Sequence, residues 1–147
     1  MKTQNLKLIA KTEEDLRVLS AHLQDSIVSV ADIANLEKNR IFLMQINRFM
    51  WEDVEKGVFR KNKRIRTILK FENILNIKSK NINLQNKDKF LDFLAIESTE
   101  LTDKNYEMKL IFSGDSIIRI TAEVIEVTLD DQGAPWESKN KPKHRNL

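Results

Sequence analysis

The sequence predicts an α+β fold in which one N-terminal helix packs on a bent antiparallel sheet, or partly closed barrel, of about seven strands. Three observations support this prediction. Helical periodicity dominates in one stretch, residues 13–26. Most of the remaining chain alternates apolar and polar residues with the period of two that strands show. The candidate strands follow one another at short spacing, which is typical of antiparallel meanders and not of βαβ units.

The N-terminal part of the chain is expected to form a short strand and then the helix. Residues 6–10 are the strand candidate. Thr12 has the side chain of an N-cap, and the three acidic residues after it would lie in the first turn, where the helix dipole favours negative charge. A helical stripe follows, made of Leu16, Leu19, Ser20, Leu23 and Ile27. We therefore expect a helix over residues 13–26.

Short strands are expected over most of the chain that follows. Residues 27–36 are apolar and rich in β-branched side chains, and residues 41–46 are apolar on both faces, which predicts a central strand. The other candidate strands are residues 64–71, 74–79, 90–97 and 106–112, with polar loops at 52–63 and 81–89. The strands at 64–71 and 74–79 are expected to pair as a hairpin. Their apolar faces predict a register with two like-charge pairs: Arg66 opposite Lys78 and Arg64 opposite Lys80.

Residues 113–131 carry the densest strand pattern in the chain. Apolar residues occupy even positions first and odd positions later: Ile118, Ile120, Ala122 and Val124, then Ile125, Val127 and Leu129. This shift predicts a bulge, or a strand that changes the side it buries. Gly114 and Asp115 tolerate positive φ and predict a hairpin turn after residues 106–112. Helical spacing within 117–130 leaves open a strand followed by a helix, but the β-branched density favours one bulged strand.

Composition limits the classes of function. The chain has 147 residues and no cysteine, which excludes disulfides and thiolate sites. Only two histidines are present, and no run approaches the ~20 apolar residues that span a bilayer. We expect a cytoplasmic protein without membrane attachment, metal or cofactor. Residues 1–136 are expected to form a single domain, followed by a basic, disordered tail at 137–147.

The chain resembles an alphaproteobacterial family of small uncharacterised proteins, a domain of unknown function. The residues that carry the resemblance are 6–10, 14–16, 18–25, 47–49, 51–52, 90–96, 118–120 and 123–126, with Asp131, Gly133, Trp136, Pro142 and His144. Residues 20–25, Ser-Ala-His-Leu-Gln-Asp, are the most specific of these matches. Where such proteins often have a Gly-Gly turn, this chain has Gly114-Asp115. The resemblance implies one domain in a bacterial cytosol and brings no established activity.

The clearest charge feature is a basic strip between residues 60 and 80. This segment carries eight basic residues and one acidic residue, whereas residues 81–136 carry five basic and eleven acidic ones. The basic strip consists of Arg60, Lys61, Lys63, Arg64, Arg66, Lys70, Lys78 and Lys80. Such a cluster is expected either to bind an anion or a nucleic-acid backbone, or to be a solvated sheet face.

Three smaller groups are candidate sites. Arg48, Trp51 and Trp136 are a candidate recognition patch. In it Arg48 meets an anion and Trp51 stacks, whereas the alternative is core aromatics with a structural arginine. Trp136 is expected either to fold back onto the domain as a plug or to await a partner. His22 is a candidate base held by Asp25, or a histidine on the flank of the helix. Glu123 and Glu126 are candidate paired carboxylates, or part of a solvated acidic face.

No enzyme motif is present: the sequence has no Gly-rich phosphate loop, no nucleophile elbow and no HExxH pattern. The favoured hypothesis is therefore a non-catalytic binding or adaptor module with a protein partner. The alternative hypothesis is a nucleic-acid-associated protein that uses the basic strip and the C-terminal tail. An enzyme that uses Glu123 with Arg48 is the weakest of the three.

Overall fold

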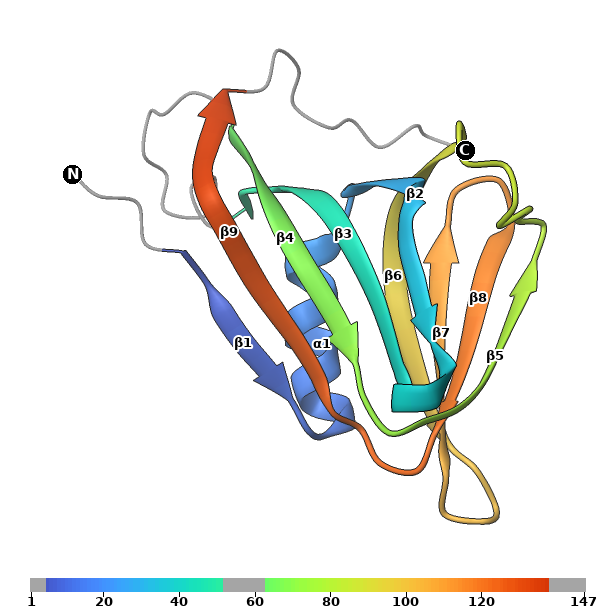
Figure 1. Ribbon diagram of the computed structural model, residues 1–147. Coiled ribbons are helices and arrows are strands. Elements are labelled where there is room, and N and C mark those ends of the chain that lie inside the picture. The colour runs from blue at the N-terminus through green and yellow to red at the C-terminus, as the bar shows by residue number, and fades with distance from the viewer. Residues whose placement is uncertain (1–4, 52–62, 138–147) are drawn as a thin grey trace.

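The computed structural model describes residues 5–51 and 63–137 of the chain (Figure 1). Within these ranges the protein is mostly antiparallel sheet with a single α-helix, which confirms the α+β class. The elements in chain order are β1 (Lys7–Ala10), α1 (Glu13–Leu23), β2 (Ile27–Leu36), the 3-10 turn η1 (Glu37–Asn39), β3 (Ile41–Phe49), β4 (Lys63–Phe71), β5 (Ile74–Lys80), β6 (Phe90–Glu100), β7 (Tyr106–Phe112), β8 (Ser116–Ala122) and β9 (Val127–Glu137).

The described strands form one sheet in the order β1-β9-β4-β3-β2-β6-β7-β8-β5. It contains nine strands, so the expected number of about seven was too low. The sheet bends strongly but does not close, and β1 and β5 form its two edges (Figure 1). The expected partly closed barrel agrees with the curvature of the sheet. It does not agree with the strand pairing, because the edge strands β1 and β5 do not pair with each other.

A bent two-stranded ribbon joins the two halves of the sheet. β4 pairs with β9 in one half, and β5 pairs with β8 in the other. The ladder continues around a corner, because the Glu72 amide donates to the Glu126 carbonyl at 3.0 Å and the Glu123 amide donates to the Asn73 carbonyl at 3.0 Å. Asn73 turns the chain with a φ of 60°. Each long strand thus passes from one half of the sheet to the other.

This corner corrects two predictions. Residues 117–130 are neither one bulged strand nor a strand followed by a helix, because β8 ends at Ala122 and β9 begins at Val127. Val124 lies at the corner and is 50% exposed, although it was assigned to the buried face. The hairpin between β4 and β5 does not form either, since their two-residue connection sends them to different partners. The register predicted for the basic strip was therefore wrong.

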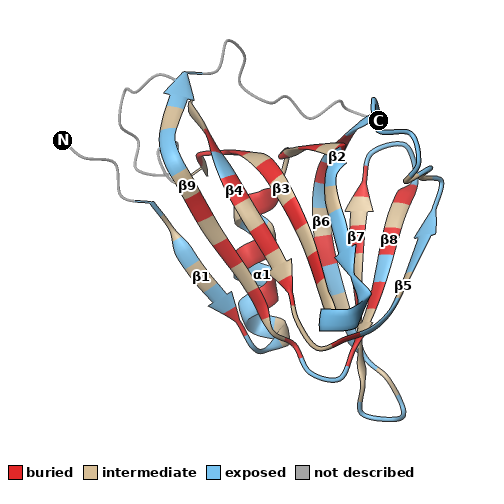
Figure 2. Ribbon diagram, in the orientation of Figure 1, coloured by how far each residue is buried: buried red, intermediate tan, exposed pale blue. Residues whose placement is uncertain are grey.

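The core lies on the inner face of the bent sheet, where α1 packs. Leu16, Leu19 and Leu23 of α1 join one cluster with the inward side chains of the strands, such as Phe93 and Ile120 (Figure 2). The expected stripe is confirmed up to Leu23. The helix ends there and not at residue 26, because the backbone of Gln24 is extended and Asp25 adopts a φ of 63°.

β2 changes its pairing along its length. Its first three residues pair with β6, and the register against β3 then shifts between Val28 and Ile33. From Ile33 to Leu36 the strand pairs only with β3. Among the described residues, the second half of β2 therefore has no pairing strand on the side opposite β3.

The hairpin core gives a first prediction. Leu110 of β7 is fully buried and lies opposite Ile118 of β8. Leu110→Ala should lower the free energy of unfolding by about 2–5 kcal/mol, because it removes buried methyl groups and leaves a cavity. Urea denaturation checks this, with the exposed Thr99→Ala as a control within ~0.5 kcal/mol of wild type. Equal losses in the two variants would contradict the buried assignment.

The helix cap gives a second prediction. The Thr12 hydroxyl accepts a hydrogen bond from the Asp15 amide at 3.0 Å, so the predicted cap is confirmed. Thr12→Ala should cost about 0.5–2 kcal/mol because one amide of the first turn loses its partner. Thr12→Ser is the matched control, since it keeps the hydroxyl. The same urea midpoint for Thr12→Ala and wild type would show that the bond contributes nothing.

Candidate functional site

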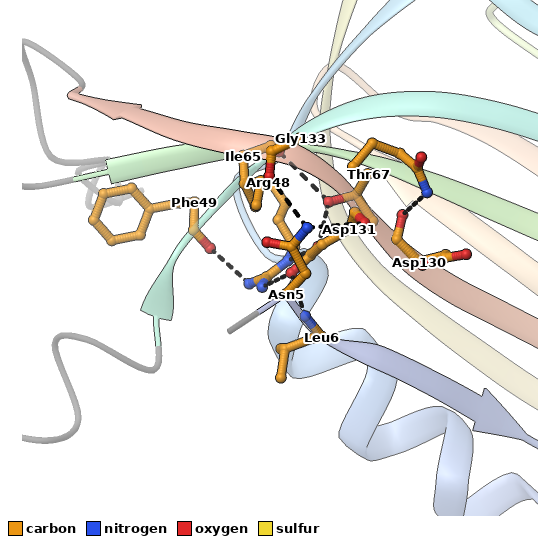
Figure 3. Close-up of polar contacts among 10 residues, drawn as sticks. Asn5, Leu6, Arg48, Phe49, Ile65, Thr67, Asp130, Asp131 and Gly133 are labelled. Carbon is orange, nitrogen blue, oxygen red and sulfur yellow. Dashed lines mark hydrogen bonds and ion pairs between the residues drawn. The ribbon is translucent and has the colours of Figure 1, made fainter. Parts of the chain in front are cut away.

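The largest fully buried side chain is that of Arg48, and it forms an ion pair inside the protein (Figure 3). Its Nε donates to Asp131 Oδ1 at 2.9 Å and its Nη2 donates to Asp131 Oδ2 at 2.7 Å. Nη1 also reaches the Phe49 carbonyl at 3.4 Å. The two ionic side chains are completely shielded from solvent. This bidentate pair links β3 to β9 across β4, which lies between them in the sheet.

The remaining lone pairs of Asp131 are also used. The Thr67 hydroxyl donates to Oδ1 at 2.7 Å, and the Leu6 amide donates to Oδ2 at 2.9 Å. Burial raises the pKa of Asp131, but hydrogen bonds and charge attraction from Arg48, with Thr67 and Leu6, outweigh it and hold the pKa below its usual value. The carboxylate therefore stays charged, and it joins β3, β4 and β9 to the residues just before β1.

The expected recognition patch of Arg48, Trp51 and Trp136 is not assembled as a surface. Arg48 is turned into the protein by its bond to Asp131. Trp51 donates through Nε1 to the Gln24 carbonyl at 2.8 Å, which fixes it beside the end of α1. Trp136 lies in β9 opposite Arg64 and is 41% exposed. The sequence suggested a patch because an arginine and aromatic residues lie close together in the chain. It could not show that the Arg48 side chain is buried.

The basic strip is divided between two parts of the sheet. Arg60 and Lys61 lie outside the described residues, and the next four members, Lys63, Arg64, Arg66 and Lys70, are on β4. Arg64 is held by the structure, because Nη1 donates to the carbonyls of Asp25 and Asn47 at 3.1 and 3.2 Å. Burial lowers its pKa, while nearby carboxylates oppose the shift. Lys70 forms an ion pair with Glu72 at 3.1 Å.

The last two members of the strip, Lys78 and Lys80, are on the edge strand β5. Lys78 lies directly opposite Arg119 of β8, and Arg119 lies directly opposite Lys109 of β7. We call these three residues the cation row. Alternating neighbours such as Ile118 and Ile120 are buried, so the row is on the outer face of the sheet.

The charges of the cation row are poorly neutralised. Among the described residues, Lys78 and Lys109 have no carboxylate within ion-pair distance, and Arg119 approaches only Glu107, at 3.9 Å. Glu97 is opposite Lys109 at the far end of the row but forms no ion pair with it. Like charges directly across a ladder destabilise a sheet. Arg119 and Lys109 were not identified from the sequence, because only the strand register places them in one row with Lys78.

A groove of about 300 Å³ lies beside the start of β5. It is lined by Asn35, Glu37, Arg40, Ile74, Leu75, Asn76 and Ile77. Its two walls are therefore the free edge of β5 and the end of β2 with the turn after it. Arg40 closes one end of the groove, because its carbonyl accepts from the Ile74 amide at 3.0 Å and its Nε donates to the Ile74 carbonyl at 3.2 Å.

The other candidate residues do not form a catalytic arrangement. Glu123 pairs with Arg40 at 2.7 Å, whereas Glu126 lies beside Glu72. The interaction between these two carboxyl groups lowers the pKa of Glu72 and raises the pKa of Glu126. The two predicted carboxylates are thus separated by different partners. His22 has a buried Nδ1 without a hydrogen-bond partner in the described ranges, so Asp25 does not orient it through that atom.

Residues 5–51 and 63–137 contain neither a cluster of metal-binding side chains nor a helix that could span a membrane. No group of three or more His, Cys, Asp or Glu side chains is arranged to hold a metal ion there. No helix in those ranges is long enough and apolar enough to cross a bilayer.

The buried ion pair gives a third prediction. Asp131→Asn should cost about 3–5 kcal/mol at pH 7, since it leaves the Arg48 charge buried without its partner. Because the pKa of Asp131 is lowered on folding, its contribution is present above the unfolded pKa, near 3.8, and is lost as pH falls through the lower folded value. Urea denaturation at several pH values should show a steeper loss below about pH 4 in wild type than in Asp131→Asn.

The combined variant Arg48→Met with Asp131→Leu is the control, because it removes both charges together. It should lose less stability than Asp131→Asn. A double variant that is less stable than the single one would contradict the role assigned to the uncompensated arginine.

The cation row gives a fourth prediction. Lys78→Glu should raise the free energy of unfolding by some tenths of a kcal/mol, because it places opposite charges across the ladder at Arg119. Lys80→Glu is a matched control, since Lys80 lies opposite Ile117 and not opposite a cation. Thermal unfolding at low salt measures both variants. Stabilisation of the same size in the two variants would mean that general charge balance, and not the pairing, is responsible.

Comparison with known proteins gives a family but no named relative. No curated protein and no solved structure shows significant similarity to the chain. A family model, described as "Protein of unknown function (DUF2948)", matches residues 6–144. The match includes α1 and all nine described strands, and it agrees with the resemblance to a domain of unknown function noted from the sequence. The chain therefore belongs to the DUF2948 family of proteins of unknown function.

Proposed function

We propose that the protein is a non-catalytic binding module that holds an anionic protein partner against the outer face of β5, β8 and β7. The observation that carries this proposal is the cation row, in which Lys78, Arg119 and Lys109 lie directly opposite one another on three neighbouring strands. The row has one weak carboxylate contact within the described residues, at Arg119. An anionic partner would neutralise these charges when it binds.

The cost of the row supports this interpretation. Each like-charge pair across a ladder lowers stability by some tenths of a kcal/mol. One acidic residue at position 78 or 119 would turn that repulsion into attraction. Some charges elsewhere in the described structure are matched: Lys70 pairs with Glu72, and Arg40 pairs with Glu123. In the cation row, by contrast, three cations on neighbouring strands have one carboxylate contact among the described residues, at 3.9 Å.

Nucleic acid is the alternative partner for this module. Its support is the number of cations in residues 60–80 and the basic segment at 137–147. Their arrangement favours it less, because Arg64 and Lys70 are engaged within the fold and lie on β4, six positions from β5 in the strand order. A duplex backbone needs cations along one continuous surface. We place the module in a bacterial cytoplasm, as its resemblance to alphaproteobacterial proteins suggests. Glu137, the first residue of the expected tail, is the last residue of β9, and residues 138–147 lie outside the described residues.

The proposal predicts selective loss of anion binding. Arg119→Glu should weaken binding of fluorescent poly-L-glutamate roughly threefold to tenfold at low salt, because two units of charge are lost from the centre of the row. The control is Arg17→Glu, which makes the same charge change on the exposed face of α1. Fluorescence anisotropy gives both affinities.

Two results would contradict the proposal. Equal weakening in the two variants would mean that only the net charge of the protein matters. Absence of salt-sensitive binding by wild type would leave the cation row as a solvated face. Binding to a 16-base-pair DNA duplex, measured in parallel, tests the alternative: a stronger affinity for DNA that falls with salt would favour the nucleic-acid hypothesis.

A further inference from the structure

β5 is an open edge strand of the sheet. It pairs with β8 and with no other strand in the described chain. Its last residues are exposed, as the pale colour of β5 in Figure 2 shows. A free edge presents main-chain amides and carbonyls in the spacing that another extended chain can pair with. The Arg40 contacts satisfy the edge only at Ile74, so the segment from Asn76 to Lys80 is available.

The groove beside β5 has a mostly polar lining, within which Leu75 and Ile77 offer apolar contact to such a chain. Leu75 is the extra residue of a bulge in β5 and is 46% exposed, and Ile77 is partly buried. Both line the groove with Asn35, which belongs to the free half of β2. Added strands bind through main-chain hydrogen bonds, and pockets for alternate side chains select their sequence. The groove could take one such side chain against Leu75 and Ile77.

The charges on the edge of β5 determine which kind of strand can pair with it. Lys78 and Lys80 are exposed on the outer side of β5, two residues apart. In a second copy of β5 the same lysines would face them, and this repulsion discourages self-association, a common use of lysine on edge strands. The charges that exclude a copy also attract a strand with acidic residues at alternate positions. A nucleic acid has no main-chain amides and could not use the edge.

We infer that β5 binds an extended acidic segment of a partner protein as an additional strand. Its alternate carboxylates lie beside Lys78 and Lys80, and its intervening apolar side chains turn toward Ile77 and the groove. This inference rests on the proposed function, because it specifies which anionic partner the cation row serves and how that partner is held.

The test uses three capped octapeptides and the full-length protein labelled with ¹⁵N. The probes are (Glu-Val)₄, the same peptide N-methylated at every residue, and (Lys-Val)₄. The acidic peptide should bind most tightly and slow the hydrogen exchange of amides between residues 76 and 80. N-methylation should weaken binding by about tenfold or more, because several main-chain hydrogen bonds are lost while the charge is kept.

Two substitutions place the peptide on the edge. Lys78→Glu with Lys80→Glu should weaken binding of (Glu-Val)₄ by about tenfold, since each lysine meets one carboxylate. The control is Arg17→Glu with Lys11→Glu, which makes an equal charge change near α1 and should leave the affinity unchanged. ¹⁵N spectra of both double variants confirm that they are folded.

The outcomes separate the inference from the proposed function. Equal binding of the acidic peptide and its N-methylated form would overturn strand addition and leave an anion-binding surface. Binding of (Lys-Val)₄ as tight as that of (Glu-Val)₄ would overturn both. Exchange protection at β1 in place of β5 would overturn the assignment to this edge. Dimerisation of the protein through β5, seen as concentration-dependent sedimentation without peptide, would mean that the occupant is a second copy.

Discussion

The buried pair of Arg48 and Asp131 is the interaction on which the arrangement of the sheet depends. Two charges without solvent are costly unless their hydrogen-bonding capacity is filled, and here the arginine, Thr67 and the Leu6 amide together occupy both carboxylate oxygens. A pair of this kind contributes more to a unique register than to net stability, because any shift of β9 against β3 would leave an unpaired charge inside the protein. It therefore fixes one end of the bent ribbon, and β5 lies at the other end of that ribbon.

The corner of the ribbon decides where the charges lie. Between Phe71 and Ile74 the chain leaves one half of the sheet and enters the other, so cations close together in sequence become distant in space. Arg64 and Lys70 are used to satisfy carbonyls and a carboxylate in the first half. Lys78 instead lies opposite Arg119 of β8, which in turn lies opposite Lys109 of β7. The chemistry of the outer face is thus a product of the register and not of any single segment.

The sequence predicted the local features well and the long-range ones poorly. The Thr12 cap, the leucines of α1, the turn at Gly114 and the alternation in β4 and β7 depend on neighbouring residues, and the structure has them. The change of phase between Val124 and Ile125 was interpreted as a bulge or a change of buried side within one strand, whereas a corner separates β8 from β9 there. The burial of Arg48 and the pairing of Lys78 with Arg119 depend on partners 83 and 41 residues away. No local pattern specifies such distances, since the hydrophobic alternation of any two strands is compatible with several pairings.

The repulsion within the cation row is small compared with the stability that a well-packed core provides. Domains are typically stable by about 5–15 kcal/mol, whereas opposed like charges on an exposed face cost only tenths. A shared core, including Leu110, Phe93 and the leucines of α1, lies beneath both halves, so repulsion between Lys78 and Arg119 does not threaten folding. The same charges would be far more costly at the position of Arg48, where solvent cannot screen them. An edge strand over a well-packed core is therefore where uncompensated charge and open hydrogen-bonding groups can be kept for a partner.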